Sequence, residues 1–300
     1  MANLAGPLVP VDADTQPRTW RHYYTDQELR HGRRLRILNF LGLPFFGALY
    51  FSIAYTMEVL SAPPKVCQDA EYAEPPLFVL VIQGVLAVVG LFAFSLSTSL
   101  LPPNISEDLY HVQKYIGGWV FLTRHCLILQ SVHLVVTFVA SVGHFAFLAC
   151  MTNSIALVIG ALGLFVTIQY FSLVHNHPEF VGMCEERMKR DPPDNCRKKN
   201  FWLHAFALPL AVLDITISRN HKALHLESSL PICLGTQSFY CLYYLAWIFG
   251  NFGCTGYWPY EFLKELKTLA AWAKFFFMQS FIMCVFCTML WVLSLLPSIW

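Results

Sequence analysis

Residues 146–174 read AFLACMTNSIALVIGALGLFVTIQYFSLV, a run without a charged side chain. A helix needs about 20 apolar residues to span a hydrocarbon core of about 30 Å, so this run is long enough to cross a membrane. The rest of the chain has a similar composition, since 56% of its 300 residues are hydrophobic and only 13% are charged. Soluble domains carry about 25% charged residues. We therefore predict an integral membrane protein.

Six further apolar stretches accompany this run and predict an all-α fold, a polytopic bundle of about seven transmembrane helices. The Arg-rich run 30–36 precedes the first stretch, and only residues 297–300 follow the last. The fifth stretch is short and contains two ionisable residues, His204 and Asp214. The predicted spans are 37–60, 77–101, 116–140, 146–174, 201–218, 231–250 and 268–295.

The chain divides by composition into three parts. Residues 1–36 form a polar N-terminal arm without the apolar core of a secretory signal, so we expect it to be retained. Its part from Trp20 to Arg36 is predicted either as an interfacial amphipathic helix or as a flexible tail. Residues 37–76 hold the first span and its outer loop, and residues 77–300 hold a membrane domain of six helices.

Basic residues are distributed unevenly between the predicted loops. The net charge is only +1, which gives no electrostatic case for binding nucleic acid. With the N-terminus inside, fifteen Lys and Arg fall on the inner side and three on the outer side. Positive charge is retained on the cytoplasmic or equivalent side, so we predict an inside N-terminus. Cys184 and Cys196 share one inner loop, where we expect no disulfide unless the compartment is oxidising.

Ionisable and nucleophilic groups inside spans are candidate site residues, because each is costly in hydrocarbon. Thr123, Arg124 and His133 lie on the third predicted span, and His204 and Asp214 lie on the fifth. Thr123 and His204 fall about 11 and 5 Å from the inner ends of their spans. A hydroxyl and an imidazole at similar depth are the minimum for a nucleophile and a general base. The alternative is that both residues serve only helix packing.

Three further residues bear on this pair. Pro209 cannot donate to the carbonyl of Ala205, so we expect the fifth span to bend and open a gap near the imidazole. Asp214 lies about 15 Å along the helix from His204, too far to orient its ring. Arg124 could stabilise an oxyanion, but we favour a structural role, either paired with Asp214 or directed toward the inner surface.

Several motifs occur in a fixed order along residues 77–300. Residues 117–123 read GGWVFLT and precede Gln130, and residues 200–209 read NFWLHAFALP. These segments resemble the G-G-x-W-x-F-L-T with a later Gln, and the N-x-x-x-H-x-x-x-L-P, of the androgen-induced-protein family of membrane hydrolases. Other positions that resemble the family pattern are the acidic Asp214, the pair Asn220 and His221, and the T-G-x-W formed by Thr255, Gly256 and Trp258.

The resemblance implies a function and a set of site residues. Members of that family are six-helix proteins that hydrolyse fatty acid esters of hydroxy fatty acids with a Thr and a His. The resemblance therefore implies Thr123 as nucleophile and His204 as base, with no cofactor and no metal. The expected partners are membrane lipids and a lipid-ester substrate. The residues predicted to line or support the pocket are Trp119, Arg124, Gln130, Pro209 and Asp214.

Two departures from the family pattern motivate a second hypothesis. The arm and the first span have no counterpart in the six-helix family, and Phe249 and Gly250 stand where the family has a His pair. The second hypothesis is a non-catalytic, lipid-binding accessory subunit of a larger membrane complex. Its protein partners would bind the N-terminal arm and the first helix. The hydrolase reading indicates the endoplasmic reticulum or another endomembrane, whereas the accessory role would suit the mitochondrial inner membrane.

A third alternative comes from histidine spacing. His221 and His225 spell H-x-x-x-H, which also begins the iron-binding boxes of membrane desaturases. Such sites need several boxes that meet at one surface. The nearest other histidines, His175 and His177, are predicted on the opposite side of the membrane. We therefore interpret His221 and His225 as loop residues.

Overall fold

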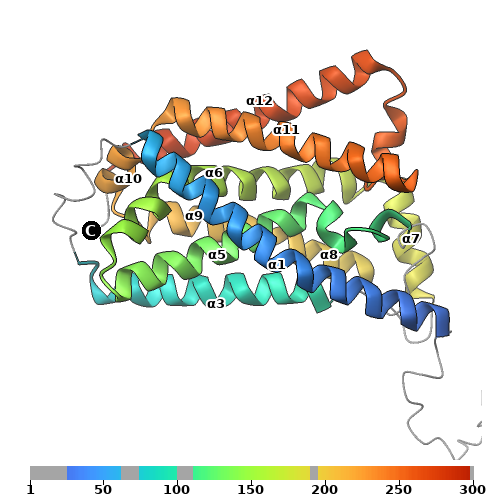
Figure 1. The fold of residues 1–300 in the computed structure, drawn as a ribbon, viewed down its shortest axis with the longest axis horizontal. Coiled ribbons are helices and arrows are strands. Elements are labelled where there is room, and N and C mark those ends of the chain that lie inside the picture. The colour runs from blue at the N-terminus through green and yellow to red at the C-terminus, as the bar shows by residue number, and fades with distance from the viewer. Residues whose placement is uncertain (1–25, 62–73, 100–110, 190–194, 298–300) are drawn as a thin grey trace, which may run out of the picture.

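The computed structural model describes residues 26–61, 74–99, 111–189 and 195–297, and these residues form helices and loops without a β-strand. The long helices run along the long axis of the molecule in Figure 1. They are α1 (Asp26–Ser61), α3 (Leu77–Ser99), α5 (Leu122–Val142), α6 (Ala146–Gln169), α11 (Leu230–Thr255) and α12 (Leu269–Leu293). The short elements are η2 (Gly117–Val120), the π-helical turn η3 (Tyr170–Val174), α7 (Pro178–Met188), α8 (Cys196–Ala205), α9 (Ala207–Thr216), α10 (His221–Glu227) and η4 (Glu261–Glu265).

The number of spans agrees with the sequence. Six described helices are long and apolar enough to cross a membrane, and a seventh span is obtained when residues Cys196–Thr216 are joined to α10 across a 98° bend. This confirms an all-α, multi-pass integral membrane protein. The short fifth stretch falls within this bent pair of helices. The side of the membrane that holds the N-terminus and the identity of the membrane stay predictions.

Several helix boundaries differ from the prediction, and two of them change its interpretation. Helix α1 already includes residues 26–36, so this part of the predicted arm continues the first span, while residues 1–25 lie outside the described part of the chain. Helix α5 begins at Leu122 rather than at residue 116, because Gly117 has a φ of 60° and residues 117–120 form a 3-10 turn. Thr123 is therefore the second residue of α5, and its predicted distance of about 11 Å from the inner end of its span is wrong.

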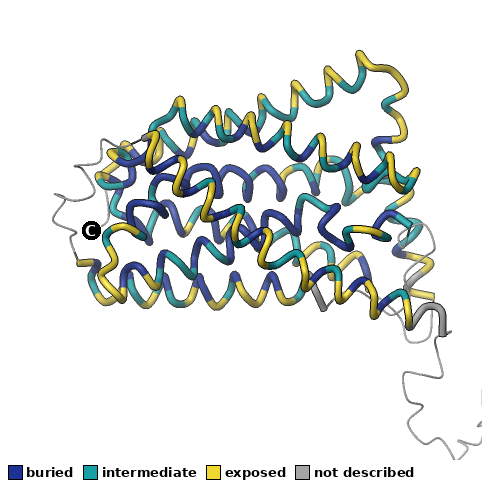
Figure 2. The backbone as a smooth tube through the Cα atoms, viewed as in Figure 1, coloured by how far each residue is buried: buried dark blue, intermediate teal, exposed yellow. Residues whose placement is uncertain are grey.

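Helix α6 occupies the centre of the bundle. It contacts α1, α5, α9, α11 and α12, and most of its residues are buried, as Figure 2 shows. Small residues such as Ala156, Gly160 and Ala161 occur along it. Small side chains allow membrane helices to approach closely, which is the main source of attraction between them in lipid. Helices α1 and α12 lie at the periphery and are much more exposed.

Asp214 belongs to a buried polar cluster rather than to the predicted pair with Arg124. One carboxylate oxygen accepts a hydrogen bond of 3.0 Å from Arg219 Nε and lies 3.2 Å from His133 Nε2. The other accepts from the Ser218 hydroxyl at 2.7 Å. Arg219, assigned by sequence to an outer loop, is only 3% exposed. Of the two structural roles considered for Arg124, pairing with Asp214 is excluded, because the chain turns after α9 and brings Arg219 back beside Asp214.

This cluster predicts a large effect of Asp214→Ala on stability. The substitution leaves the Arg219 guanidinium buried without its carboxylate, and breaking a buried ion pair costs about 3–5 kcal/mol. We expect SDS-titrated unfolding in mixed micelles to show a loss of this size. Ser218→Ala removes one hydrogen bond to the same carboxylate and should cost only about 1 kcal/mol. Equal losses in the two variants would contradict the assignment.

Candidate functional site

The structure brings Thr123 and His204 into direct contact. The hydroxyl Oγ1 of Thr123, on α5, lies 2.7 Å from Nε2 of His204, on α8. The other ring nitrogen, Nδ1, lies 2.8 Å from the backbone carbonyl oxygen of Asn200. Because a carbonyl only accepts hydrogen bonds, Nδ1 carries the proton of the neutral ring, and the Nε2 lone pair faces the Thr123 hydroxyl. This is the tautomer that a general base requires.

Residues from the end of α6 fix the position of the imidazole. The ring of Tyr170 stacks on that of His204 with centroids 3.7 Å apart and planes 8° from parallel. The hydroxyl of Thr167 donates a hydrogen bond of 2.8 Å to the carbonyl of His204. Tyr170 begins the π-helical turn, a feature that occurs frequently at functional sites. Its hydroxyl lies 3.2 Å from Nδ1 of His175.

The environment of His175 favours the neutral ring, which can accept this hydrogen bond. Burial lowers the pKa of His175, and the positive charge of Arg197 lowers it further. Tyr170 therefore donates to His175 while its ring face covers His204. Sequence reasoning missed Tyr170 and Thr167, and no spacing signal marks them. Asn200 was within reach, since position i−4 of a helix places its carbonyl next to the side chain of His204.

Thr123 lies in the first turn of α5. Phe121 is extended, with φ −92° and ψ 127°, and helical geometry starts at the next residue. The N–H of Leu122 donates to the hydroxyl oxygens of Tyr244 and Tyr260, both at 3.0 Å. Burial raises the pKa of Tyr260 and keeps this phenol protonated. The N–H of Thr123 donates to no other residue in the described part of the chain. A helix N-terminus with an open amide favours negative charge beside it.

The turn η2 supports this helix start. Trp119 is buried, and its carbonyl accepts hydrogen bonds from His125 Nε2 at 2.5 Å and from Trp247 Nε1 at 2.9 Å. The buried guanidinium of Arg124 lies 5.8 Å from the centroid of the Trp119 ring. A cation over an indole face at this distance is attracted to it. Arg124 thus packs against the turn, which fits the structural role that we favour.

Gln130 joins α5, which carries Thr123, to α9, which follows the helix of His204. Its Nε2 donates a hydrogen bond of 2.9 Å to the carbonyl of Ala207, the first residue of α9. Ala207 follows directly after Phe206, where the helix from Cys196 to Thr216 is interrupted. Pro209 lies just beyond this interruption, as expected from its missing N–H. Gln130 therefore binds the broken segment to α5, one turn away from His204.

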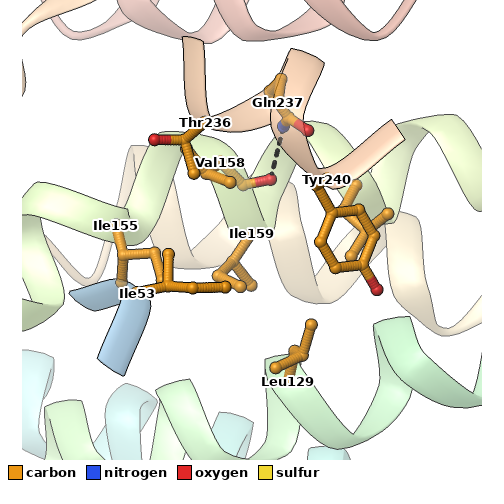
Figure 3. A pocket seen from close by; sticks show the side chains of 9 residues that line it. Ile53, Leu129, Ile155, Val158, Ile159, Thr236, Gln237 and Tyr240 are labelled. Atoms are coloured by element: carbon orange, nitrogen blue, oxygen red, sulfur yellow. Dashed lines mark hydrogen bonds between the residues drawn. The ribbon is translucent and has the colours of Figure 1, made fainter. Parts of the chain in front are cut away.

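Two hollows in the structure lie away from the pair. One is a small cavity of about 10 Å³, and the hydrogen bond of 2.8 Å from Gln237 Nε2 to the Val158 carbonyl lies at its edge. This volume is roughly the room that one water needs. Figure 3 shows the side chains that line the cavity. An open apolar groove of about 620 Å³ lies between α3 and α5, next to Gly84 and Phe138. Neither hollow is lined by Thr123 or His204.

The remaining motif residues make contacts at the ends of the helix bundle. Trp258 stacks on Phe252 with centroids 3.9 Å apart, which fixes the turn between α11 and α12. Both ring nitrogens of His221 lie 3.0 Å from backbone carbonyls, those of Ile215 and Leu296. His221 lies on α10, whereas His175 precedes α7 at the opposite end of the bundle (Figure 1). The two histidine groups do not meet.

A family model described as FAR-17a/AIG1-like protein matches residues 78–294. The chain belongs to this family. This confirms the resemblance to the androgen-induced proteins that the motifs indicated. The matched region contains both Thr123 and His204 and leaves out α1. Neither the curated proteins nor the solved structures include a match to the chain.

A disulfide lies next to the segment that carries His204, contrary to our expectation for this loop. It joins Cys184 of α7 to Cys196, the first residue of α8, with Cα atoms 5.3 Å apart. Both residues are buried. The side chain of Asn195 caps α8 by accepting a hydrogen bond from the N–H of Lys198. The start of α8 is thus held covalently to α7.

The disulfide predicts selective protection of two thiols. In protein denatured without reductant, Cys184 and Cys196 should resist a maleimide reagent, and they should react after reduction. Cys254 is an exposed free cysteine and serves as the control that reacts under both conditions. Mass spectrometry of the labelled peptides measures the outcome. Maleimide on Cys184 or Cys196 before reduction would contradict the prediction.

Proposed function

We propose that the protein is an intramembrane hydrolase of lipid esters, with fatty acid esters of hydroxy fatty acids as substrates. Thr123 is the nucleophile and His204 the general base. The observation that carries the proposal is the 2.7 Å separation of Thr123 Oγ1 and His204 Nε2, with Nδ1 held by the Asn200 carbonyl. A base must lie within about 2.6–3.2 Å of the proton that it abstracts. Membership of the FAR-17a/AIG1-like family supports a membrane hydrolase fold.

The first half of the reaction forms an acyl-threonine. Thr123 Oγ1 attacks the ester carbonyl carbon, and its proton passes to Nε2 of His204. The carbonyl oxygen becomes an oxyanion, which the open N–H of Thr123 and the positive end of α5 stabilise. When the tetrahedral intermediate collapses, the ester C–O bond breaks. His204 gives its proton to the departing alkoxide, which leaves as the hydroxy fatty acid.

The second half releases the other product. Water attacks the acyl carbon while His204 Nε2 takes its proton, and a second oxyanion forms at the same place. The acyl–oxygen bond to Thr123 then breaks, and the proton on His204 returns to Oγ1. The free fatty acid leaves, and the pair regains its starting state. Both halves require an imidazole that does not rotate, a requirement that Tyr170 and the Asn200 carbonyl meet.

The test uses the full chain in lipid nanodiscs with a fluorophosphonate probe and a hydroxy fatty acid ester substrate. We expect the wild type to be labelled and to hydrolyse the ester. Thr123→Ala should lose labelling, and both Thr123→Ala and His204→Ala should lower kcat by about 1,000-fold or more. Thr123→Ser keeps a nucleophilic hydroxyl and should retain both activities.

Thr152→Ala is the matched control, since it removes another buried hydroxyl, on α6, that bonds only its own helix. Its turnover and labelling should equal those of the wild type. Labelling that persists in Thr123→Ala would exclude this residue as the nucleophile. A wild type that is neither labelled nor active would favour the accessory-subunit hypothesis.

A further inference from the structure

Helix α1 lies outside the region matched by the family model, yet it bonds directly to the turn that precedes Thr123. The side-chain Oδ1 of Asn39 accepts a hydrogen bond of 2.8 Å from the N–H of Gly118. The indole N–H of Trp119 points at the α1 backbone, 3.2 Å from the carbonyl of Leu38 and 3.1 Å from that of Asn39. The Asn39 side chain and the carbonyls of Leu38 and Asn39 lie on one turn of α1. They accept hydrogen bonds from two consecutive residues of η2, Gly118 and Trp119.

The shapes of the two segments fit each other closely. A β-carbon on Gly42 of α1 would overlap the indole of Trp119, so the missing side chain gives the indole access to the helix backbone. On the side of η2, Gly117 has a φ of 60°, and a β-carbon added to it would lie 2.7 Å from Asn39 Oδ1. Asn39 itself is only 4% exposed. The turn and α1 therefore make a buried contact that leaves little room for either to move.

A short series of hydrogen bonds leads from this contact to the nucleophile. Gly118, whose N–H is held by Asn39, accepts a bond of 3.1 Å from the N–H of Phe121 through its carbonyl. The carbonyl of Phe121 accepts a bond of 3.0 Å from the N–H of Arg124. Thr123 lies between these two residues. The position of its hydroxyl and of its open N–H thus depends on where η2 lies.

We propose that Asn39 is a positioning residue for ester hydrolysis, and that α1 is a working part of the catalytic site rather than an added membrane anchor. This inference rests on the proposed hydrolase function. Asn39 touches neither Thr123 nor His204 and acts by holding η2. Misplacement of a nucleophile by about 1 Å can lower a rate by about 100-fold, so a small shift of the turn has a large effect on kcat.

The same helix supplies a matched control farther along. The hydroxyl of Tyr50 lies 2.9 Å from Nδ1 of His133, within the buried cluster of Asp214. Tyr50 is buried, as Asn39 is, and it joins α1 to α5 through one polar contact, whereas Asn39 joins α1 to η2. Tyr50→Phe therefore loosens the attachment of α1 without touching η2. A purely structural role of α1 predicts the same kinetic effect from both substitutions.

The experiment compares Asn39→Ala, Gly42→Ala and Tyr50→Phe with the wild type in nanodiscs. It measures kcat and KM for the ester, the rate of fluorophosphonate labelling, and stability by SDS titration. We expect Asn39→Ala and Gly42→Ala to lower kcat and the labelling rate by about 10- to 100-fold, with KM within about twofold of the wild type. Tyr50→Phe should lose stability but keep its kcat within about twofold.

The outcomes separate this inference from the proposed function. An active wild type whose Asn39→Ala and Tyr50→Phe variants lose kcat equally, or not at all, would overturn the role of Asn39 and leave the hydrolase intact. A wild type without turnover and labelling would overturn the hydrolase and this role together. If Asn39→Ala does not fold, Gly42→Ala perturbs the same contact from the other side, and a wild-type kcat in that variant would overturn the proposal.

Discussion

Every polar group that this chain places at membrane depth must find its partner inside the helix bundle, because lipid offers none. Two clusters meet this requirement in different ways. Around Asp214 the partners are complementary charges and hydrogen bonds that satisfy one another, so the cluster holds α5 and α9 together. Around Thr123 the partners are a base, a ring face and backbone atoms, and the N–H of Thr123 has no acceptor among the residues that the structure describes. The first arrangement stabilises the fold. The second leaves a hydroxyl beside a base, which the proposed reaction needs.

A backbone carbonyl, rather than a carboxylate, orients the ring of His204. In hydrolytic triads a carboxylate commonly holds the base, and a buried carboxylate in the membrane would add a large desolvation cost. Here a carbonyl of the same helix takes that place, at the i−4 position. A backbone carbonyl already lies in the bundle and carries no charge. Asp214 can therefore lie far from the imidazole, and the pair still has the tautomer that it needs.

The features that follow from composition could be predicted from the sequence. Long apolar runs have no stable state in a bilayer except a helix, so the spans and the break near Pro209 were within reach. The pairing of Thr123 with His204 was indicated by the motifs, whereas the predicted depth of Thr123 in its span was wrong. The partners of Asp214, the stacking of Tyr170 and the contact of Asn39 with Gly118 were not, because each depends on how separate helices rotate and pack. No local pattern encodes those rotations.

The extra helix changes how the two functional hypotheses compare. From sequence, α1 counted against catalysis, because an added helix offers surface for a partner. In the structure, its outer face is exposed and apolar, as expected beside lipid, whereas its inner face bonds to the turn before Thr123. A helix that serves only as a docking surface has no need for a buried asparagine aimed at that turn. The contact between Asn39 and Gly118 therefore favours the hypothesis in which α1 positions the turn before Thr123.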